Sequence, residues 1–217
     1  MTNFKSLLPV LGATLLAAQL GLAQSDQMSF FITSAGPGDG ANLGGLKGAD
    51  AHCQKLAKAA GSKKKGWKAY LSQAPEGKMK AVNAKDRIGK GPWYNSKGVK
   101  VADSIDNLHS ENMGLGKDGS LTEKGDKVNG RGDKPNTHDI LTGSNADGTL
   151  ASGAAKEVTC NNWTSNTEGS AWVGHHDRQG GGTRPNSWNS AHQSKGCSQP
   201  NLVATGGAGL FYCFAPK

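Results

Sequence analysis

Apolar and polar residues alternate in several short stretches of this chain, and the alternation predicts strands. Residues 28–34 are rich in aromatic and β-branched side chains, and residues 67–72 alternate as a half-buried strand does. A further strand is predicted at residues 139–142. Residues 158–164 and 210–215 are predicted to be the closing strands, each of which carries a cysteine.

A different periodicity, typical of a helix, runs through residues 48–60. The apolar positions of this segment fall on one face, and Gly61 can end the helix. That face consists of Ala49, Cys53, Leu56, Ala57 and Ala60. We therefore expect Cys53 to lie on the side of the helix that packs against the rest of the domain.

The middle of the chain, residues 83–156, is mostly polar and contains many Gly, Asn and Asp residues, which indicates short helices and loops. Glycine supplies 32 of the 217 residues, about twice its usual share. Strands and a helix on either side of a looped middle part predict a mixed α+β fold. We expect a single domain over residues 24–217.

Residues 1–23 have the parts of a secretory signal peptide. Lys5 provides the positive charge, residues 7–22 are mostly apolar, and Gly21-Leu22-Ala23 fits a cleavage site. The apolar run is shorter than the ~20 residues that span a bilayer. We expect a secreted or periplasmic protein without a transmembrane anchor after cleavage; the alternative is a retained anchor.

Four cysteines, Cys53, Cys160, Cys197 and Cys213, frame the mature chain. Disulfides persist outside the cytosol, so these cysteines are expected to be paired. Four cysteines allow three pairings, and the sequence by itself does not choose among them. A nested pairing would tie the two ends of the domain together and close a second loop between them.

The formal net charge is +8, and a basic patch contributes much of it. The patch consists of Lys55, Lys58, Lys63, Lys64, Lys65 and Lys68. Such a patch attracts sulfated glycans or anionic surfaces, and the alternative is a solvated face that keeps the protein soluble. A secreted location makes nucleic acid the least expected partner.

Several ordered motifs resemble a bacterial secreted family with an endostatin-like, C-type-lectin-like fold. The motifs are Phe30-Phe-Ile-Thr-Ser34, Asn42-Leu-Gly-Gly-Leu46, Gly48-Ala-Asp-Ala-His-Cys53-Gln, Ala69-Tyr-Leu-Ser72, Asp86-Arg-Ile88, Leu141-Thr-Gly143, Cys160-Asn-Asn-Trp-Thr-Ser165, Gly196-Cys197 and Leu210-Phe-Tyr-Cys213. The resemblance implies the nested pairing, Cys53 with Cys213 and Cys160 with Cys197. Similar proteins are known as lectins, or as adhesins (spirochaetal ones among them) that bind extracellular-matrix and serum proteins.

The calcium-binding motifs of the wider fold are incomplete in this chain. Calcium-dependent lectins use Glu-Pro-Asn or Gln-Pro-Asp together with Trp-Asn-Asp. Here Trp188-Asn189-Ser190 lacks the last carboxylate, and Gln199-Pro200-Asn201 follows the third cysteine, which is out of order. Calcium takes six to eight oxygen ligands, preferably carboxylates, so no cofactor is predicted, and the alternative is a bound calcium ion.

The richest polar cluster in the sequence is Gly174-His175-His176-Asp177-Arg178. Two imidazoles and a carboxylate are zinc-type ligands, but adjacent histidines on a strand point in different directions. We therefore predict hydrogen-bonding or ligand-binding roles and no metal. His192 lies in the same region and can join the cluster.

Catalytic motifs are not evident. There is no Gly-x-Ser-x-Gly elbow, and the cysteines are assigned to disulfides, so no enzyme is predicted.

The adhesion tripeptide Arg131-Gly132-Asp133 recurs often by chance. Trp67 and Trp163 are expected in the core, whereas an exposed Trp188 can stack on a sugar face.

These observations predict a non-catalytic binding module whose ligand surface lies in the long loop region. The candidate residues are Trp188, Asn189, His175, His176, Asp177, Arg178 and Asn186. The predicted partners are polysaccharides or the glycans of glycoproteins. The alternatives are an adhesin that uses the basic patch against extracellular-matrix proteins or sulfated glycans, and a structural envelope protein.

Overall fold

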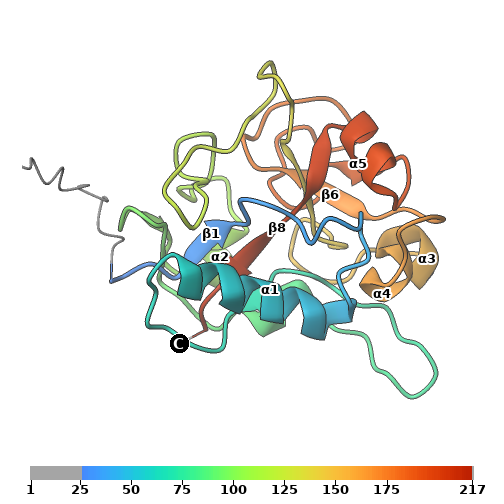
Figure 1. The fold of residues 1–217 in the computed structure, drawn as a ribbon, viewed down its shortest axis with the longest axis horizontal. Helices are drawn as coiled ribbons and strands as arrows, with labels where there is room; N and C mark the ends of the chain where they lie inside the picture. The colour runs from blue at the N-terminus through green and yellow to red at the C-terminus, as the bar shows by residue number, and fades with distance from the viewer. Residues whose placement is uncertain (1–25, 217) are drawn as a thin grey trace, which may run out of the picture.

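The computed structural model describes residues 26–216, so the predicted signal peptide lies outside the described part. A six-stranded sheet is built around the long strand β8 (Gly207–Phe214) (Figure 1). The strand order is β1-β8-β5-β6-β7, and β2 also pairs with β8. The other strands of this sheet are β1 (Phe30–Ile32), β2 (Lys68–Ala69), β5 (Asp139–Leu141), β6 (Trp172–His175) and β7 (His192–Gln193).

Strand β8 is buried on both faces, which explains its nearly continuous apolar sequence. It runs antiparallel to β1 and β2 and parallel to β5. Phe211 and Cys213 face one hydrophobic cluster, which also contains Phe31 and Trp67. Leu210, Tyr212 and Phe214 face a second cluster on the other side of the sheet, with Phe30 and Trp93.

Helix α1 (Gly45–Ala59) covers one face of the sheet (Figure 1). Ala49, Cys53 and Ala57 are its buried residues, in agreement with the predicted apolar face. Cys53 forms a disulfide with Cys213 on β8. The helix begins three residues before the predicted start, because Gly44 has a left-handed backbone (φ 72°) that ends the preceding loop.

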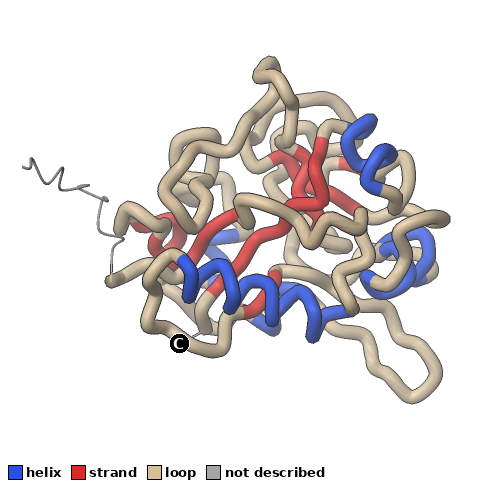
Figure 2. Tube along the Cα trace, in the orientation of Figure 1, coloured by secondary structure: helices blue, strands red, loops and turns tan. Residues whose placement is uncertain are grey.

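Loops make up most of the remaining chain (Figure 2). The short elements are η1 (Ala84–Arg87), α2 (Ile105–Leu108), α3 (Ala155–Val158), α4 (Cys160–Trp163), α5 (Gln199–Thr205), and a two-stranded sheet of β3 (Trp93–Tyr94) and β4 (Lys100–Ala102). The fold is therefore mixed α+β, as predicted. Within residues 26–216, no helix has both the length and the apolar character needed to cross a membrane.

Both disulfides follow the nested pairing, Cys53–Cys213 and Cys160–Cys197. The strands predicted at residues 28–34, 67–72, 139–142 and 210–215 correspond to β1, β2, β5 and β8. Trp67 and Trp163 are core residues, as expected.

The strand predicted at residues 158–164 is wrong. Four consecutive residues, 160–163, have left-handed backbones with φ between 47° and 65°. A left-handed backbone costs a non-glycine residue roughly 1–2 kcal/mol, so strong contacts must hold the turn. Trp163 Nε1 donates to the Ser72 carbonyl at 2.7 Å, and Cys160 is held by its disulfide. Asn162 accepts from the Ala74 amide at 2.8 Å and donates to the Ala74 carbonyl at 3.2 Å.

Two asparagines in this turn offer a matched test of what holds it. Asn161 (φ 56°) is exposed and Asn162 (φ 55°) is buried. We expect Asn162→Gly to lower the free energy of unfolding by about 1–3 kcal/mol, because buried partners at Ala74 lose their hydrogen bonds. Asn161→Gly, at the same backbone geometry, is expected to change it by less than about 0.5 kcal/mol. Urea denaturation measures both, and equal losses would contradict the assignment.

Candidate functional site

Three neighbouring strands bring polar side chains together at one end of the main sheet. Asp139 begins β5, His175 ends β6, and His192 begins β7. Asp139 pairs directly with His175, and His192 pairs with Val173, two residues before His175. Residues two apart on a strand share a face, so the three side chains project to the same side.

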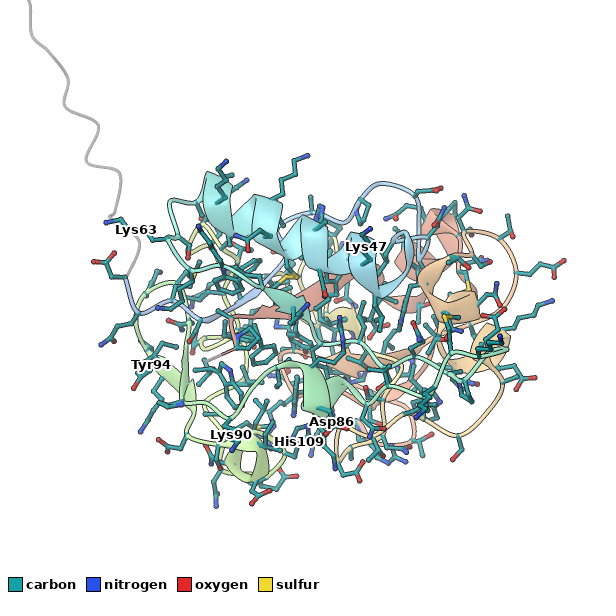
Figure 3. All side chains as sticks on the ribbon, turned by 90° about the horizontal axis from the view of Figure 1, so that it is seen from below. Lys47, Lys63, Asp86, Lys90, Tyr94 and His109 are labelled. Carbon is teal, nitrogen blue, oxygen red and sulfur yellow. A yellow bond between two sulfur atoms is a disulfide. The ribbon has the colours of Figure 1, made fainter. Side chains whose placement is uncertain are left out.

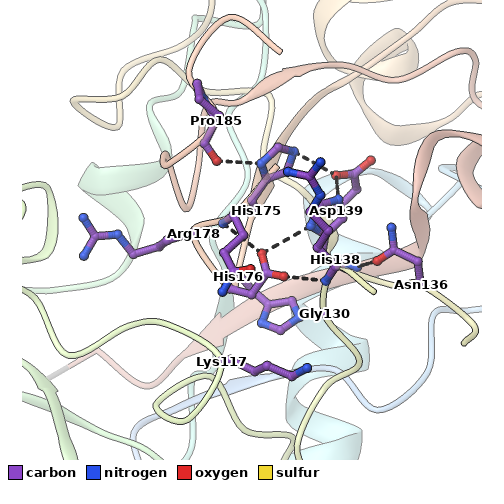
Figure 4. Close-up of polar contacts among 12 residues, drawn as sticks. Lys117, Gly130, Asn136, His138, Asp139, His175, His176, Arg178 and Pro185 are labelled. Atoms are coloured by element: carbon purple, nitrogen blue, oxygen red, sulfur yellow. Dashed lines mark hydrogen bonds and ion pairs between the residues drawn. The ribbon is translucent and has the colours of Figure 1, made fainter. Parts of the chain in front are cut away.

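His138 completes this group from the loop before β5. Its ring stacks on the ring of His175 with centroids 4.3 Å apart and an angle of 8° between the planes. We call His138, Asp139, His175 and His192 the histidine–aspartate cluster (Figure 4 labels the first three).

The four side chains converge on a small volume. Asp139 Oδ1 lies 3.3 Å from the Nε2 atoms of both His138 and His175, and 3.6 Å from that of His192. The Nε2 atoms of His175 and His192 are 3.0 Å apart. His138, Asp139 and His175 can each offer a ligand atom to one metal ion, since these atoms lie within 4.8 Å of one another.

The second ring nitrogen of each histidine is bonded outside the cluster. His175 Nδ1 lies 2.8 Å from the Pro185 carbonyl, and His192 Nδ1 lies 3.0 Å from the Gln193 carbonyl. His138 Nδ1 lies 3.2 Å from Asp177 Oδ1. These oxygens can only accept a hydrogen bond, so each Nδ1 carries the proton.

Burial shapes the electrostatics of the cluster. Asp139 is 2 % exposed, and neither of its carboxylate oxygens has a hydrogen-bond partner. Burial lowers the pKa of the His175 imidazole, but the Asp139 carboxylate and the Pro185 carbonyl outweigh this effect, so the pKa is raised overall.

His176 points away from the cluster (Figure 4), in agreement with the prediction that adjacent histidines diverge. Its Nε2 lies 3.1 Å from the Asn129 carbonyl. Burial lowers the pKa of the His176 imidazole. Both histidines are buried, so neither side chain lies on the outer surface of the loop region.

Asp177 is also buried and links two loops. Its carboxylate accepts from the Arg131 amide at 2.6 Å and from the Gln179 amide at 3.2 Å. Burial raises the pKa of this carboxyl group, but the hydrogen bonds from His138 and Arg131 outweigh it and hold the pKa below its ordinary value. Asp177 therefore holds two loops together. Its side chain is buried and does not face solvent.

Trp188 is 2 % exposed, so the prediction of an exposed stacking indole is wrong. Its ring packs among Tyr70, His109 and Tyr212, with centroids 4.8, 5.7 and 5.0 Å away. Tyr212 also donates its hydroxyl proton to the Trp188 carbonyl at 2.7 Å. These aromatic partners come from distant parts of the sequence, which is why local pattern did not reveal the burial.

Asn189 is buried beside Trp188. Its amide donates to the Tyr70 hydroxyl at 2.9 Å and to the Asn145 and Ala146 carbonyls at 3.1 and 3.2 Å. The Asn189 side chain thus donates its hydrogen bonds to other parts of the protein. It joins the 184–189 segment to the 145–146 turn.

A recess of about 290 Å³ nevertheless collects three of the predicted residues, Asn186, Trp188 and Asn189. Its walls are residues 109–111 and 184–189, together with Met113 and Ala146. Glu111 and Asn186 are exposed at its edge. Arg178 braces the two walls: its guanidinium forms an ion pair with Glu111 and donates to the Asn186 carbonyl at 3.4 Å.

A larger recess of about 540 Å³ lies elsewhere, between the Thr33–Gly38 segment and residues 122–129. It is lined also by Thr137, Gln199, Ala208 and Leu210 and contains none of the predicted ligand residues.

The Arg131-Gly132-Asp133 tripeptide is a turn in which Asp133 pairs with Lys117 at 2.7 Å.

Two lysines of the basic patch make contacts within the protein. Lys68 pairs with Asp50 at 3.0 Å, and Lys64 donates to the Asp26 carbonyl at 3.1 Å. Lys55, Lys58, Lys63 and Lys65 are exposed, and none of the ion pairs within residues 26–216 involves them. Lys47 and Lys63 lie on the α1 side of the molecule, opposite His109 and Tyr94 (Figure 3).

Comparison with known proteins gives no further guidance. No family model matches this chain, and no curated protein matches it.

Sequence reasoning missed His138 and Asp139, although it placed a strand at residues 139–142. The available signal was the His-Asp pair at the start of that strand, which faces the His175 end of β6 once the sheet forms. Pairing between strands 36 residues apart could not be read from spacing alone.

The buried phenols under the recess have a measurable consequence at high pH. Burial raises the pKa of the Tyr70 and Tyr212 hydroxyls, so the folded state keeps both protonated. An unfolded tyrosine ionises near pH 10, so stability is lost as the pH rises above that value. In Tyr94→Phe, which leaves only these two tyrosines, we expect the phenolate absorbance to rise only as circular dichroism reports unfolding. An earlier rise would contradict the assignment.

Proposed function

We propose that this protein is a secreted, non-catalytic binding module with a C-type-lectin-like fold, and that it binds a carbohydrate in the recess beside Trp188. The observation that carries the proposal is the convergence of Asn186, Trp188 and Asn189 on one recess of about 290 Å³. Its size is near the lower end for small-molecule sites.

The chemistry of the recess supports a polar, hydroxyl-rich ligand. Glu111 and Asn186 supply exposed acceptors and donors, and Ser110 and Ser187 supply hydroxyls. The Trp188 ring is packed between two tyrosines and His109, so this side of the recess is held rigidly. A few fixed polar groups in a concave recess are a common arrangement in small-ligand sites.

The mixed α+β fold and the nested disulfides are consistent with the proposed family. The inner disulfide joins Cys197, which follows the loop region in the sequence, to Cys160. The outer disulfide joins α1 to β8. Persistent disulfides agree with a secreted or periplasmic location.

A second candidate function is adhesion to sulfated glycans or extracellular-matrix proteins through the basic patch. The four exposed lysines, which form no ion pair within the described residues, support it. Such binding weakens with ionic strength, since exposed charges are screened within about 10 Å at 0.1 M salt.

The test is a glycan array with the mature protein and with Glu111→Gln and Asn186→Ala, both at exposed positions. We expect each variant to weaken sugar binding by about 10-fold, the effect of losing one or two hydrogen bonds to a ligand. Asn112→Ala is the matched control, because Asn112 is exposed nearby but does not line the recess.

Other outcomes separate the alternatives. Binding that is unchanged in both recess variants but lost in Lys124→Ala would place the ligand in the larger recess and contradict the proposal. Binding that is lost only in Lys55→Ala/Lys58→Ala and at high salt would favour adhesion through the basic patch. Binding to no glycan would remove the carbohydrate hypothesis.

A further inference from the structure

One wall of the recess beside Trp188 is held by hydrogen bonds whose direction is fixed. His109 Nδ1 lies 2.8 Å from the Ile105 carbonyl, which can only accept, so this nitrogen carries the proton. In a neutral ring the other nitrogen, Nε2, is then an acceptor, and it lies 2.7 Å from the Tyr70 hydroxyl. Tyr70 therefore donates its proton to His109.

The Tyr70 hydroxyl faces a donor on its other side. Asn189 Nδ2 lies 2.9 Å from this hydroxyl, and 3.1 and 3.2 Å from the Asn145 and Ala146 carbonyls. Because carbonyls can only accept, the nitrogen of the amide must face all three oxygens, and Asn189 donates to Tyr70. The bonds thus run in one direction, from Asn189 through Tyr70 to His109. Since His109, Ala146 and Asn189 line the recess, these bonds set its shape.

We propose that the recess keeps its binding shape only while His109 is neutral, so that acid opens the recess and releases its ligand. This inference rests on the proposed function, because it describes the regulation of the same site. A protonated Nε2 is a donor, so the Tyr70 hydroxyl would lie between two donors and its own proton would lose its acceptor. Tyr70 is fully buried, and a buried polar group that loses its partner is costly. The wall of the recess must then move.

Glycine backbone covers the contact between His109 and Tyr70. A Cβ at Gly148 would lie 2.4 Å from His109 Nε2 and 2.8 Å from the Tyr70 hydroxyl oxygen. Gly148 ends the turn of residues 145–148, in which its amide donates to the Asn145 carbonyl at 3.0 Å. Because Ala146 of this turn lines the recess, movement of the turn changes the shape of the recess.

The surroundings of His109 oppose a positive charge on its ring. Within residues 26–216, no ion pair involves His109. The charged groups around it are Lys85 on η1, Asp106 on α2 and Asp147 in the 145–148 turn, and Lys85 pairs with Asp147 at 3.9 Å. Burial lowers the pKa of the His109 imidazole, and the hydrogen bond to the Ile105 carbonyl and the two carboxylates do not outweigh it.

Two further charged residues line the recess, Glu111 and Arg184. Glu111 pairs with Arg178. Arg184 donates to the Ser190 carbonyl at 3.3 Å and lies over the Trp172 ring, 5.5 Å from its centre. Both residues are thus held by partners other than the His109 ring.

The direction of the pKa shift places the switch on the acid side of neutrality. An unfolded histidine titrates near about pH 6.5. Because the pKa of His109 in the folded protein lies below this value, the unfolded chain takes up the proton first. The folded state is therefore destabilised as the pH falls below about 6.5, and above that value the ring stays neutral and the recess keeps its shape.

The first experiment follows His109 by NMR in the mature protein, without any glycan. The pKa values of His175 and His176 are shifted in opposite directions, so overall stability does not report on His109. With isotope-labelled histidine, we expect the neutral His109 ring to carry its proton on Nδ1 and to titrate below about pH 6.5. The indole N–H signal of Trp188, whose ring lies 5.7 Å from that of His109, and the amide signal of Gly148 should shift with the same midpoint.

Two tyrosine variants separate the hydrogen bond from burial. Tyr70→Phe removes the donor to His109 Nε2 but leaves the ring covered, so we expect the pKa of His109 to rise. Tyr212→Phe is the matched control, because its hydroxyl is also buried but donates to the Trp188 carbonyl at 2.7 Å. This control should leave the pKa of His109 unchanged.

The second experiment measures binding of a fluorescent form of the glycan that gives the strongest array signal. In wild type, we expect the dissociation constant to rise by up to about tenfold for each pH unit below the pKa of His109, since one proton competes with the ligand. His109→Gln provides a neutral acceptor that does not titrate. Relative to its own affinity at about pH 8, this variant is expected to keep only the weaker dependence that carboxyl groups produce near about pH 4.

Three results would overturn the proposal. The first is a pKa of His109 at or above about 6.5, or a neutral ring with its proton on Nε2. The second is a His109 titration that leaves the Trp188 and Gly148 signals unchanged, and the third is the same pH dependence of binding in wild type and His109→Gln. If no glycan binds, the proposed carbohydrate function fails, and the NMR titration still decides whether His109 controls the recess. If glycan binding does not depend on His109, the proposed function stands and this inference fails.

Discussion

The central strand β8 is the constraint on which the rest of the structure depends. It is buried on both faces, pairs with β1, β2 and β5, and is joined to α1 through Cys213. A strand buried in this way must satisfy its backbone hydrogen bonds with neighbouring strands, so segments from both ends and the middle of the chain are drawn to it. In a chain with so few regular elements, this one strand organises both hydrophobic clusters.

That dependence explains which parts of the fold could be predicted from the sequence. The apolar run of β8 and the helical face around Cys53 are local patterns, and both were found. The segment 158–164 was misread because Val158, Thr159 and Trp163 are typical strand residues. Its backbone is set instead by distant partners, Ser72, Ala74 and Cys197, which no local pattern contains.

The candidate site divides in the same way. The sequence showed that His175 and His176 diverge and that His192 can join the cluster, since alternation along a strand decides direction. It did not show that Trp188 is covered by Tyr70 and Tyr212, or that Asp139 pairs with His175. Both facts arise from the order of strands in the sheet. Trp188, which was expected at the surface, is therefore buried in the core.

The loop of residues 176–191 has a consequence beyond its own contacts. Its ends are fixed by the pairing of β6 with β7, so its entry and exit points do not depend on what lies between them. The entropy cost of closing a loop grows only slowly with its length. Gly181 and Thr183 are exposed, and nothing lies within 4 Å of a Cβ placed at Gly181, so these two positions can accept new side chains while the sheet and both disulfides stay in place. The domain is in this respect a display scaffold, in which recognition can be re-engineered without redesigning the fold.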